Sequence, residues 1–279
     1  MENQIIGIDT GNRCVKSANH VFVSGIQESD RPQPFQRGIV FYNNKYYMLS
    51  QSRVTYMQDK TANDDYFVMT LFAIVDELKT RGITAKENEA VPVVLGVGLP
   101  PSHVPRLKEK FKAYFNRGTV RFSLDNVNYV IDIRGVYVFA QGYAAIYNDY
   151  AEISKYTTAY IIDIGGYTTD VIALSHGQID ASFCQSRDMG LIQLYNKISW
   201  EIKGKYGFAP SEEQIDNVII TGEELSPKMP VSSIIDVQVS AYVDNRLRKL
   251  IEYGVDINFA KGVFVGGGAI RLRKWIELS

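Results

Sequence analysis

One short pattern occurs twice in this chain, and it constrains the fold more than any other feature. The first copy is the run IIGIDTGN at residues 5–12, and the second is YIIDIGGYTTD at residues 160–170. In each copy an apolar, β-branched strand ends on Asp, turns through Gly two residues later and re-enters a strand. The position seven residues beyond the Asp is charged in both copies, as Lys16 and Asp170. Two copies about half a chain apart predict a duplicated domain rather than an array of short repeats.

The chemistry of this turn suits a polyphosphate with a divalent cation. A glycine turn lets backbone N–H groups approach an anion closely, because no Cβ stands in the way. A carboxylate would repel phosphate, so we expect Asp9 and Asp163 to hold a hydrated cation, a role that suits Mg²⁺. Lys16 would supply positive charge to the same phosphates. One Asp-x-Gly turn would indicate only an ordinary hairpin, but two matched copies predict turns that grip a nucleoside triphosphate from both sides.

Length and composition agree with a two-domain globular protein. The 279 residues can build two cores, and 46% apolar with 22% charged residues is typical of soluble proteins. A net charge of −1 and an isoelectric point near 6.3 predict no general attraction to nucleic acid or to an anionic membrane. The longest apolar run, residues 91–99, is too short to span a membrane, and residues 1–8 do not resemble a signal peptide. Cys14 and Cys184 lack metal-binding spacing, so we expect a reduced, cytoplasmic protein.

Hydrophobic periodicity and turn residues predict the other elements. Strands or hairpins are expected over residues 5–24, 38–49, 91–99, 119–139, 160–179 and 215–221. Residues 25–38 are expected to form a loop. Helices are expected over residues 65–80, which Gly82 would end, and over 101–115, 139–147, 191–202 and 232–254. The strand 262–265 is expected to pass through Gly266, Gly267 and Gly268 into a helix at 270–278. A strand that ends in three glycines predicts close approach of a flat or anionic group, here the adenine and ribose.

Together these motifs resemble the actin/heat-shock/sugar-kinase ATPase superfamily. They follow its order of phosphate-one, connecting, phosphate-two and adenosine motifs: Asp9-x-Gly11 with Lys16, then Gln141, then Asp163-x-Gly165-Gly166-x-Thr168-x-Asp170, then Gly266-Gly267-Gly268. The compact length and the Val-Gly-Leu-Pro-Pro segment are most similar to bacterial ParM/StbA-type proteins, which polymerise with ATP to segregate plasmids. The resemblance implies an α/β, actin-like fold with two ribonuclease H-like domains flanking a nucleotide cleft. Residues 1–153 would form the first domain and residues 154–268 the second, and a C-terminal helix at 269–279 would return towards the first.

The resemblance also implies a role for each motif residue. Asp9 and Asp163 would lie against the hydration shell of Mg²⁺, and Gln141 would orient the water that attacks the γ-phosphate of ATP. Gln cannot act as a base at neutral pH, so catalysis would be positioning plus electrostatics. Contacts to the phosphates would come from Thr10, Gly11, Asn12, Lys16, Gly165, Gly166, Tyr167 and Thr168. The adenosine would rest against Gly266, Gly267, Gly268 and Ala269. Asp170 takes the place of an actin His, and either the water network or the metal could be its partner.

The function implied is a filament-forming ATPase for plasmid DNA segregation, with ATP or ADP and Mg²⁺ as cofactors. Its partners would be further copies of itself and a DNA-binding adaptor at the filament end, with no direct contact to nucleic acid or membrane. One alternative is a sugar- or acetate-type kinase on the same fold, in which Asp170 would serve as the acceptor base. Another is a cytoskeletal or cell-division actin relative that does not segregate DNA. A heat-shock chaperone would need a peptide-binding domain beyond residue 279.

Overall fold

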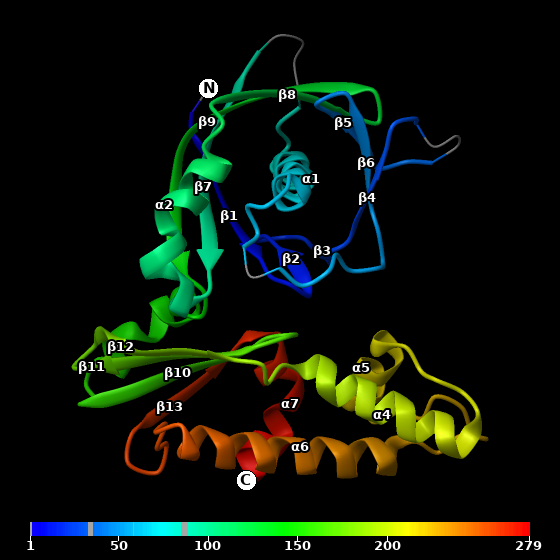
Figure 1. The fold of residues 1–279 in the computed structure, drawn as a ribbon, viewed down its shortest axis with the longest axis vertical. Coiled ribbons are helices and arrows are strands. Elements are labelled where there is room, and N and C mark those ends of the chain that lie inside the picture. Colours follow the sequence, from blue (N-terminus) through cyan, green and yellow to red (C-terminus); the bar gives the residue numbers. More distant parts are fainter. Residues whose placement is uncertain (1, 33–35, 58, 85–88) are drawn as a thin grey trace. The chain divides into compact units, whose positions relative to one another are not determined.

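The computed structural model describes residues 2–32, 36–57, 59–84 and 89–279 (Figure 1). The chain divides into two compact units, Met1–Gln141 and Gly142–Ser279. The division lies before the segment 142–153, which the sequence assigned to the first domain. This segment joins the second unit, where the Tyr150 hydroxyl donates a hydrogen bond of 2.7 Å to the Gly177 carbonyl.

In its described residues, the first unit is a nine-stranded sheet with two α-helices. Its strands are β1 (Gln4–Thr10), β2 (Cys14–Lys16), β3 (Val21–Val23), β4 (Ile26–Ser29), β5 (Ile39–Tyr42), β6 (Lys45–Leu49), β7 (Val91–Leu99), β8 (Thr119–Leu124) and β9 (Val127–Ala140). They lie in the order β3-β2-β1-β7-β9-β8-β5-β6-β4. The helices are α1 (Asp65–Thr80) and α2 (Val104–Phe115), and a 3₁₀ turn, Pro101–His103, precedes α2.

Helix α1 forms the centre of this unit, because the strongly curved sheet passes around it (Figure 1). Nearly every residue from Tyr66 to Leu78 is buried, including the polar Thr70 and Glu77. A helix that is apolar on all sides can be stable only in such an interior position. The helix ends as expected at Gly82, which adopts a left-handed φ of 69° and donates to the Lys79 carbonyl.

The second unit is a four-stranded sheet packed against helices. Its strands are β10 (Thr158–Ile164), β11 (Thr169–Ser175), β12 (Gln178–Arg187) and β13 (Lys261–Val265), in the order β12-β11-β10-β13. Its α-helices are α3 (Tyr150–Ile153), α4 (Leu191–Tyr206), α5 (Glu212–Thr221), α6 (Ser232–Glu252) and α7 (Gly266–Leu278), and a 3₁₀ helix, Tyr143–Asp149, precedes α3. Its core joins Ile162, Ile164 and Val171 of the sheet to apolar side chains of α4, α5, α6 and α7.

Both units repeat the same pairing of three strands around the Asp-x-Gly turn, as the duplicated sequence pattern predicts. In the first unit β1 pairs antiparallel with β2 and parallel with β7. In the second, β10 pairs antiparallel with β11 and parallel with β13. The matched charges seven residues apart now have a structural reason: Asp9 lies directly opposite Lys16, and Asp163 directly opposite Asp170.

Two predicted elements are wrong. Residues 215–221 form helix α5 rather than a strand, with Ile215, Val218 and Ile219 buried at helical spacing. A capping box at Ser211 and Gln214 starts this helix by satisfying backbone groups at its N-terminus. The predicted loop at 25–38 contains strand β4, which pairs with β6, while its residues 33–35 lie outside the described part of the chain.

Two further element boundaries differ from the predicted ones. Residues 139 and 140 end strand β9, and the helical segment expected there begins as a 3₁₀ helix at Tyr143. The three glycines at 266–268 are not a linker before a helix but the first turn of α7 itself. Helix α7 packs against β10, α5 and α6 of its own unit; the return of residues 269–279 towards the first domain stays a prediction.

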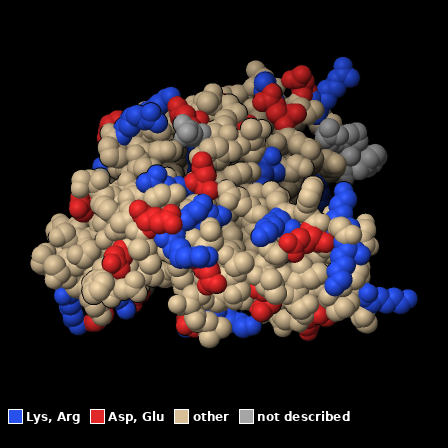
Figure 2. All heavy atoms as spheres, turned by 60° about the horizontal axis from the view of Figure 1, so that its bottom comes forward, with Lys and Arg blue, Asp and Glu red and all other residues tan. Residues whose placement is uncertain are grey.

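The surface carries both signs of charge. On the face that Figure 2 shows, Lys and Arg side chains are interspersed with Asp and Glu. Within the described residues, no helix has both the length and the apolar composition that crossing a membrane requires.

Candidate functional site

The first Asp-x-Gly turn brings three predicted residues together at the end of β1. Asp9 lies opposite Lys16, whose Nζ is 3.3 Å from Asp9 Oδ2. Gln141 follows the end of β9, and its amide Nε2 donates a hydrogen bond to Asp9 Oδ1. The backbone N–H of Gln141 donates to the Leu99 carbonyl at 2.9 Å, which holds the residue beside β7. A carboxylate, an ammonium and an amide thus converge within one unit, although Gln141 lies far from Asp9 in the sequence.

Glycine is required at the centre of this turn. A Cβ on Gly11 would lie 2.7 Å from the Cys14 carbonyl oxygen, which is too close for any other residue without a backbone shift. The Gly11 carbonyl accepts a hydrogen bond of 2.5 Å from Ser24 Oγ on the neighbouring chain segment. The turn therefore needs glycine for reasons internal to the unit, because its own backbone fills the space that a side chain would take.

Two residues that the sequence did not single out support the turn from inside. Lys60 Nζ donates to the carbonyl of Thr10, and the Tyr66 hydroxyl donates to Asn12 Oδ1 at 3.0 Å. The Lys60 and Thr10 side chains are both buried. Thr10 is buried as a whole residue, backbone included, so its contact with a phosphate stays a prediction. Lys60 stands in a polar segment, and a lone Lys there is normally exposed, so no sequence signal could have found it.

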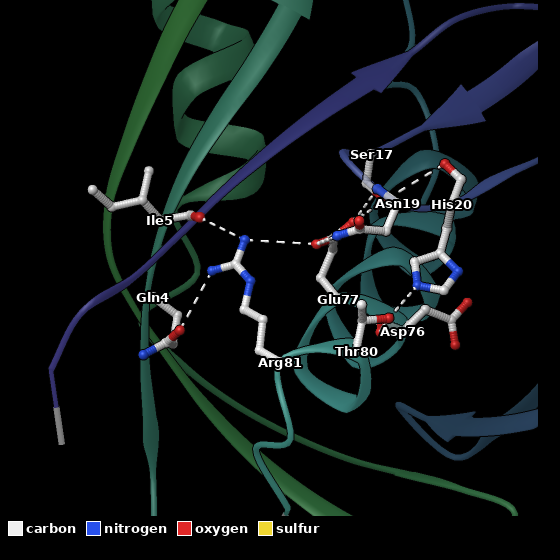
Figure 3. A network of polar contacts seen from close by, with 9 residues as sticks. All are labelled: Gln4, Ile5, Ser17, Asn19, His20, Asp76, Glu77, Thr80 and Arg81. Atoms are coloured by element: carbon white, nitrogen blue, oxygen red, sulfur yellow. Dashed lines mark hydrogen bonds and ion pairs between the residues drawn. The ribbon is translucent and has the colours of Figure 1, made fainter.

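A buried carboxylate ties the hairpin that carries Lys16 to helix α1 (Figure 3). Glu77 accepts hydrogen bonds from Ser17 Oγ at 2.7 Å, from the Asn19 backbone N–H at 2.8 Å and from Asn19 Nδ2 at 2.9 Å. Burial by itself would raise the pKa of the Glu77 carboxyl, but these donors and the Arg81 guanidinium together hold that pKa below its usual value. Arg81 in turn donates to the Ile5 carbonyl at 3.0 Å. The network links α1 to both β1 and the β2–β3 turn.

The second Asp-x-Gly turn is closed by backbone hydrogen bonds. The Gly165 N–H donates to the Thr168 carbonyl at 2.9 Å. The carbonyls of Gly165, Gly166 and Tyr167 accept from residues 191, 192 and 190, at the start of α4. Helix α4 therefore satisfies its first N–H groups with carbonyls of the turn. This pairing orients the peptide groups of the turn and fixes it to the helix.

Asp163 and Asp170 lie opposite one another across the β10–β11 hairpin. Asp170 is buried, and the Thr168 hydroxyl donates to its Oδ2 at 3.0 Å. The hydroxyl of Thr168, predicted to contact a phosphate, thus has a partner within the protein. Asp170 is positioned by the turn rather than extended towards solvent.

The three glycines of α7 lie against the end of β10. A Cβ on Gly266 would come within 3.0 Å of Asp163 Oδ1, and a Cβ on Gly268 within 3.0 Å of Ile164. A Cβ on Gly267 would meet only the end of the flexible Arg271 side chain, at 3.0 Å. Gly266 also has a φ of 86°, which favours glycine. The structure therefore places the predicted adenosine motif beside the second turn, and packing alone explains two of its three glycines. Ala269, the last residue of the motif, is buried.

Each turn offers one carboxylate next to glycine backbone. This is the donor set that Mg²⁺ uses when waters and phosphate oxygens complete its octahedron. Among the described residues, no group of three His, Cys, Asp or Glu side chains could hold a metal by itself. Asp9 and Asp163 belong to different units. Each turn is therefore described by itself as one half of the candidate site.

Family models match both halves of the chain. A model of the N-terminal domain of actin-like proteins matches residues 7–143. A model of the C-terminal part of archaeal MreB-like actin homologues matches residues 161–277. No curated protein matches the sequence significantly.

Solved structures with the same fold cover nearly the whole chain. An archaeal actin homologue, Ta0583, in complex with ADP has a TM-score of 0.74 and 14% identity, covering 99% of this chain and 90% of its own. A ParM from a 15-stranded Clostridium botulinum filament has a TM-score of 0.68 and 18% identity, covering 100% and 92%. Bacillus thuringiensis ParM with ATP has a TM-score of 0.69 and 13% identity, covering 99% and 90%. At these identities the likeness establishes the fold.

Proposed function

This chain belongs to the actin-like ATPase superfamily, and on that premise we propose that it hydrolyses ATP and assembles with ATP into filaments. The observation that carries the proposal is the matched pair of turns. In each unit an Asp stands one residue before the end of a strand, a glycine turn follows, and a charged residue lies directly opposite that Asp. Such turns suit the two ends of one metal-bound polyphosphate.

The residues of the first turn supply electrostatics and positioning. Lys16 would neutralise phosphate charge, and Asp9 would hold a water of the Mg²⁺ hydration shell. Gln141, already bonded to Asp9, would orient the attacking water without accepting its proton. Asp163 would play the part of Asp9 in the second turn. When bound, Mg²⁺ would supply charge neutralisation for the phosphates.

Filament assembly is the part of the proposal that extends beyond the nucleotide site. One of the similar structures is described as a 15-stranded filament, which supports self-assembly as the expected readout. Plasmid segregation through a DNA-binding adaptor at the filament end belongs to the same proposal. Its test is whether the filaments capture a DNA-bound protein encoded on the same replicon.

Sedimentation tests the proposal directly. The protein is incubated with Mg²⁺ and either ATP or ADP, and pelleted protein and released phosphate are measured together. We expect ATP to move protein into the pellet and phosphate to be released, while ADP leaves the protein in the supernatant. Phosphate release without pelleting would support the proposed ATPase activity and contradict the proposed filament assembly. If the protein neither pellets nor releases phosphate with ATP, the proposal as a whole is contradicted.

A small-molecule kinase on the same fold is the competing function. It would need an acceptor base, and Asp170 is the candidate that the sequence offers. That carboxylate is buried and bonded to Thr168, which disfavours contact with an acceptor hydroxyl. Labelled ATP incubated with sugars and with acetate separates the two: transfer of label to an acceptor would favour the kinase.

A further inference from the structure

We propose that Lys60 is a positioning residue for the polyphosphate, acting on the first turn from behind its backbone. The inference rests on the proposed nucleotide site and adds to it a charged residue that no motif contains. Lys60 does not need to touch the nucleotide. It acts through the peptide group between Thr10 and Gly11.

The geometry centres on that peptide group. The Lys60 side chain is only 4% exposed, and its ammonium donates to the Thr10 carbonyl oxygen. The carbonyl of Thr10 and the N–H of Gly11 belong to the same planar unit and point in opposite directions. A cation on the carbonyl side therefore polarises the N–H on the other side, which strengthens it as a donor to an anion.

An aromatic side chain holds the lysine in place. Lys60 Nζ lies 5.1 Å from the centre of the Tyr66 ring, within the range of a cation–π contact. The hydroxyl of the same tyrosine donates to Asn12 Oδ1 at 3.0 Å. Lys60 and Tyr66 thus hold the residues on both sides of Gly11, from one buried position.

Burial is what makes this charge effective. Water screens an exposed lysine strongly, but a buried ammonium acts through protein of lower dielectric constant, so its field extends further. Lys16, by contrast, has a side chain that is 44% exposed. The first turn therefore has two cations with different roles: an exposed one able to contact phosphate and a buried one that polarises the backbone.

A purely structural role for Lys60 makes a different prediction. If Lys60 only held the loop in place, its loss would weaken the binding of every nucleotide by a similar factor. An electrostatic role requires the loss to increase with the phosphate charge of the ligand. A comparison of AMP, ADP and ATP separates these possibilities.

The experiment is calorimetric titration of AMP, ADP and ATP, with Mg²⁺, into the wild type, Lys60→Met and Lys60→Gln. Lys60→Met removes charge and donor, whereas Lys60→Gln removes the charge and keeps an amide donor. We expect both variants to bind ATP about tenfold more weakly, ADP about threefold more weakly and AMP almost unchanged. Lys60→Arg keeps the charge and should stay within about twofold of the wild type for ATP.

Lys45→Met is the matched control, because Lys45 lies in the same unit and its partner is Glu28, away from the turn. It should bind all three nucleotides like the wild type. Equal losses for AMP and ATP, or no loss in either Lys60 variant that folds, would overturn the role of Lys60 and leave the nucleotide site intact. A wild type that binds none of the three would overturn the proposed function and this inference together.

Discussion

At the scale of single residues, the two turns use equivalent positions for different purposes. Lys16 pairs with Asp9 across the first hairpin, whereas the equivalent Asp170 faces Asp163 across the second. Two carboxylates in register would repel one another if both were fully charged and unsupported. The Thr168 hydroxyl bonds to Asp170, which is buried, whereas Asp163 is only half-buried. This asymmetry favours Asp163 as the functional carboxylate of that turn.

Replacement of Asp163 tests that assignment. We expect Asp163→Ala to lower ATP turnover by about two to three orders of magnitude, because it removes preorganised electrostatics from the transition state. Asp149→Ala, an exposed carboxylate in the same unit, is the control and should turn over ATP like the wild type. Turnover at the wild-type rate in Asp163→Ala would refute the site assignment.

Adjacent glycines of α7 should respond differently to the same substitution. Gly268→Ala would force a Cβ into Ile164, and we expect it to lower the free energy of unfolding by about 1–3 kcal/mol. Gly267→Ala meets only the Arg271 side chain and gains helix propensity, so its unfolding free energy should change by less than about 1 kcal/mol. Urea denaturation measures both. If Gly267→Ala nonetheless weakens ATP binding, the ribose and adenine contact predicted there gains support.

At the scale of elements, Glu77 determines how the Lys16 hairpin is attached to α1. Three donors from the β2–β3 turn converge on one buried carboxylate. Side-chain and backbone donors together make the charged form the favoured one. The hairpin is therefore attached through charge-assisted hydrogen bonds rather than through apolar packing alone.

The stability contributed by Glu77 should depend on pH. Its pKa is lower in the folded protein than in the unfolded chain, so the contribution is complete above about pH 4.5 and is lost as pH falls through the lower folded value. We expect Glu77→Gln to lower the unfolding free energy by about 2–4 kcal/mol at neutral pH and to remove that part of the acid sensitivity.

Urea denaturation between about pH 7 and pH 3 would measure both effects. Glu109→Gln, an exposed carboxylate on α2, is the control and should keep the acid sensitivity of the wild type. An unchanged pH profile in Glu77→Gln would show that Glu77 does not link the hairpin to α1 in this way.

At the scale of the whole molecule, one arrangement of three paired strands occurs in both units, and each unit has its own hydrophobic core. In the proposed function, one ligand would contact the Asp-x-Gly turn of each unit. It would bind the folded protein and not the unfolded chain, so it must stabilise folding by mass action.

Thermal unfolding with and without ATP and Mg²⁺ tests this. ATP at about one hundred times its Kd should raise the free energy of unfolding by about 2.7 kcal/mol. Asp9→Ala and Asp163→Ala, one in each unit, should each reduce that stabilisation. If only one of them did so, a single unit would hold the nucleotide, and the two-sided site would be wrong.

Some parts of the protein could be predicted from sequence and others could not. The hairpins, helix α1 and the position of Gly82 follow from local periodicity and turn chemistry, which act within a few residues. Helix α5 was missed because Val218, Ile219 and Ile220 form an apolar run like a strand. The Ser211–Gln214 capping box was the signal that could have identified it.

By itself, the sequence determined the two Asp-x-Gly turns and their duplication, because backbone conformation at glycine and the strand pattern depend on neighbouring residues. Only the tertiary structure decided which side chains support those turns. Lys60 and Glu77 are separated from the groups they bond by about fifty residues or more, so their burial depends on how β1, the β2–β3 turn and α1 pack together. Long-range packing likewise decided that Gly266 and Gly268 must be glycine, because β10 lies against them in the folded unit.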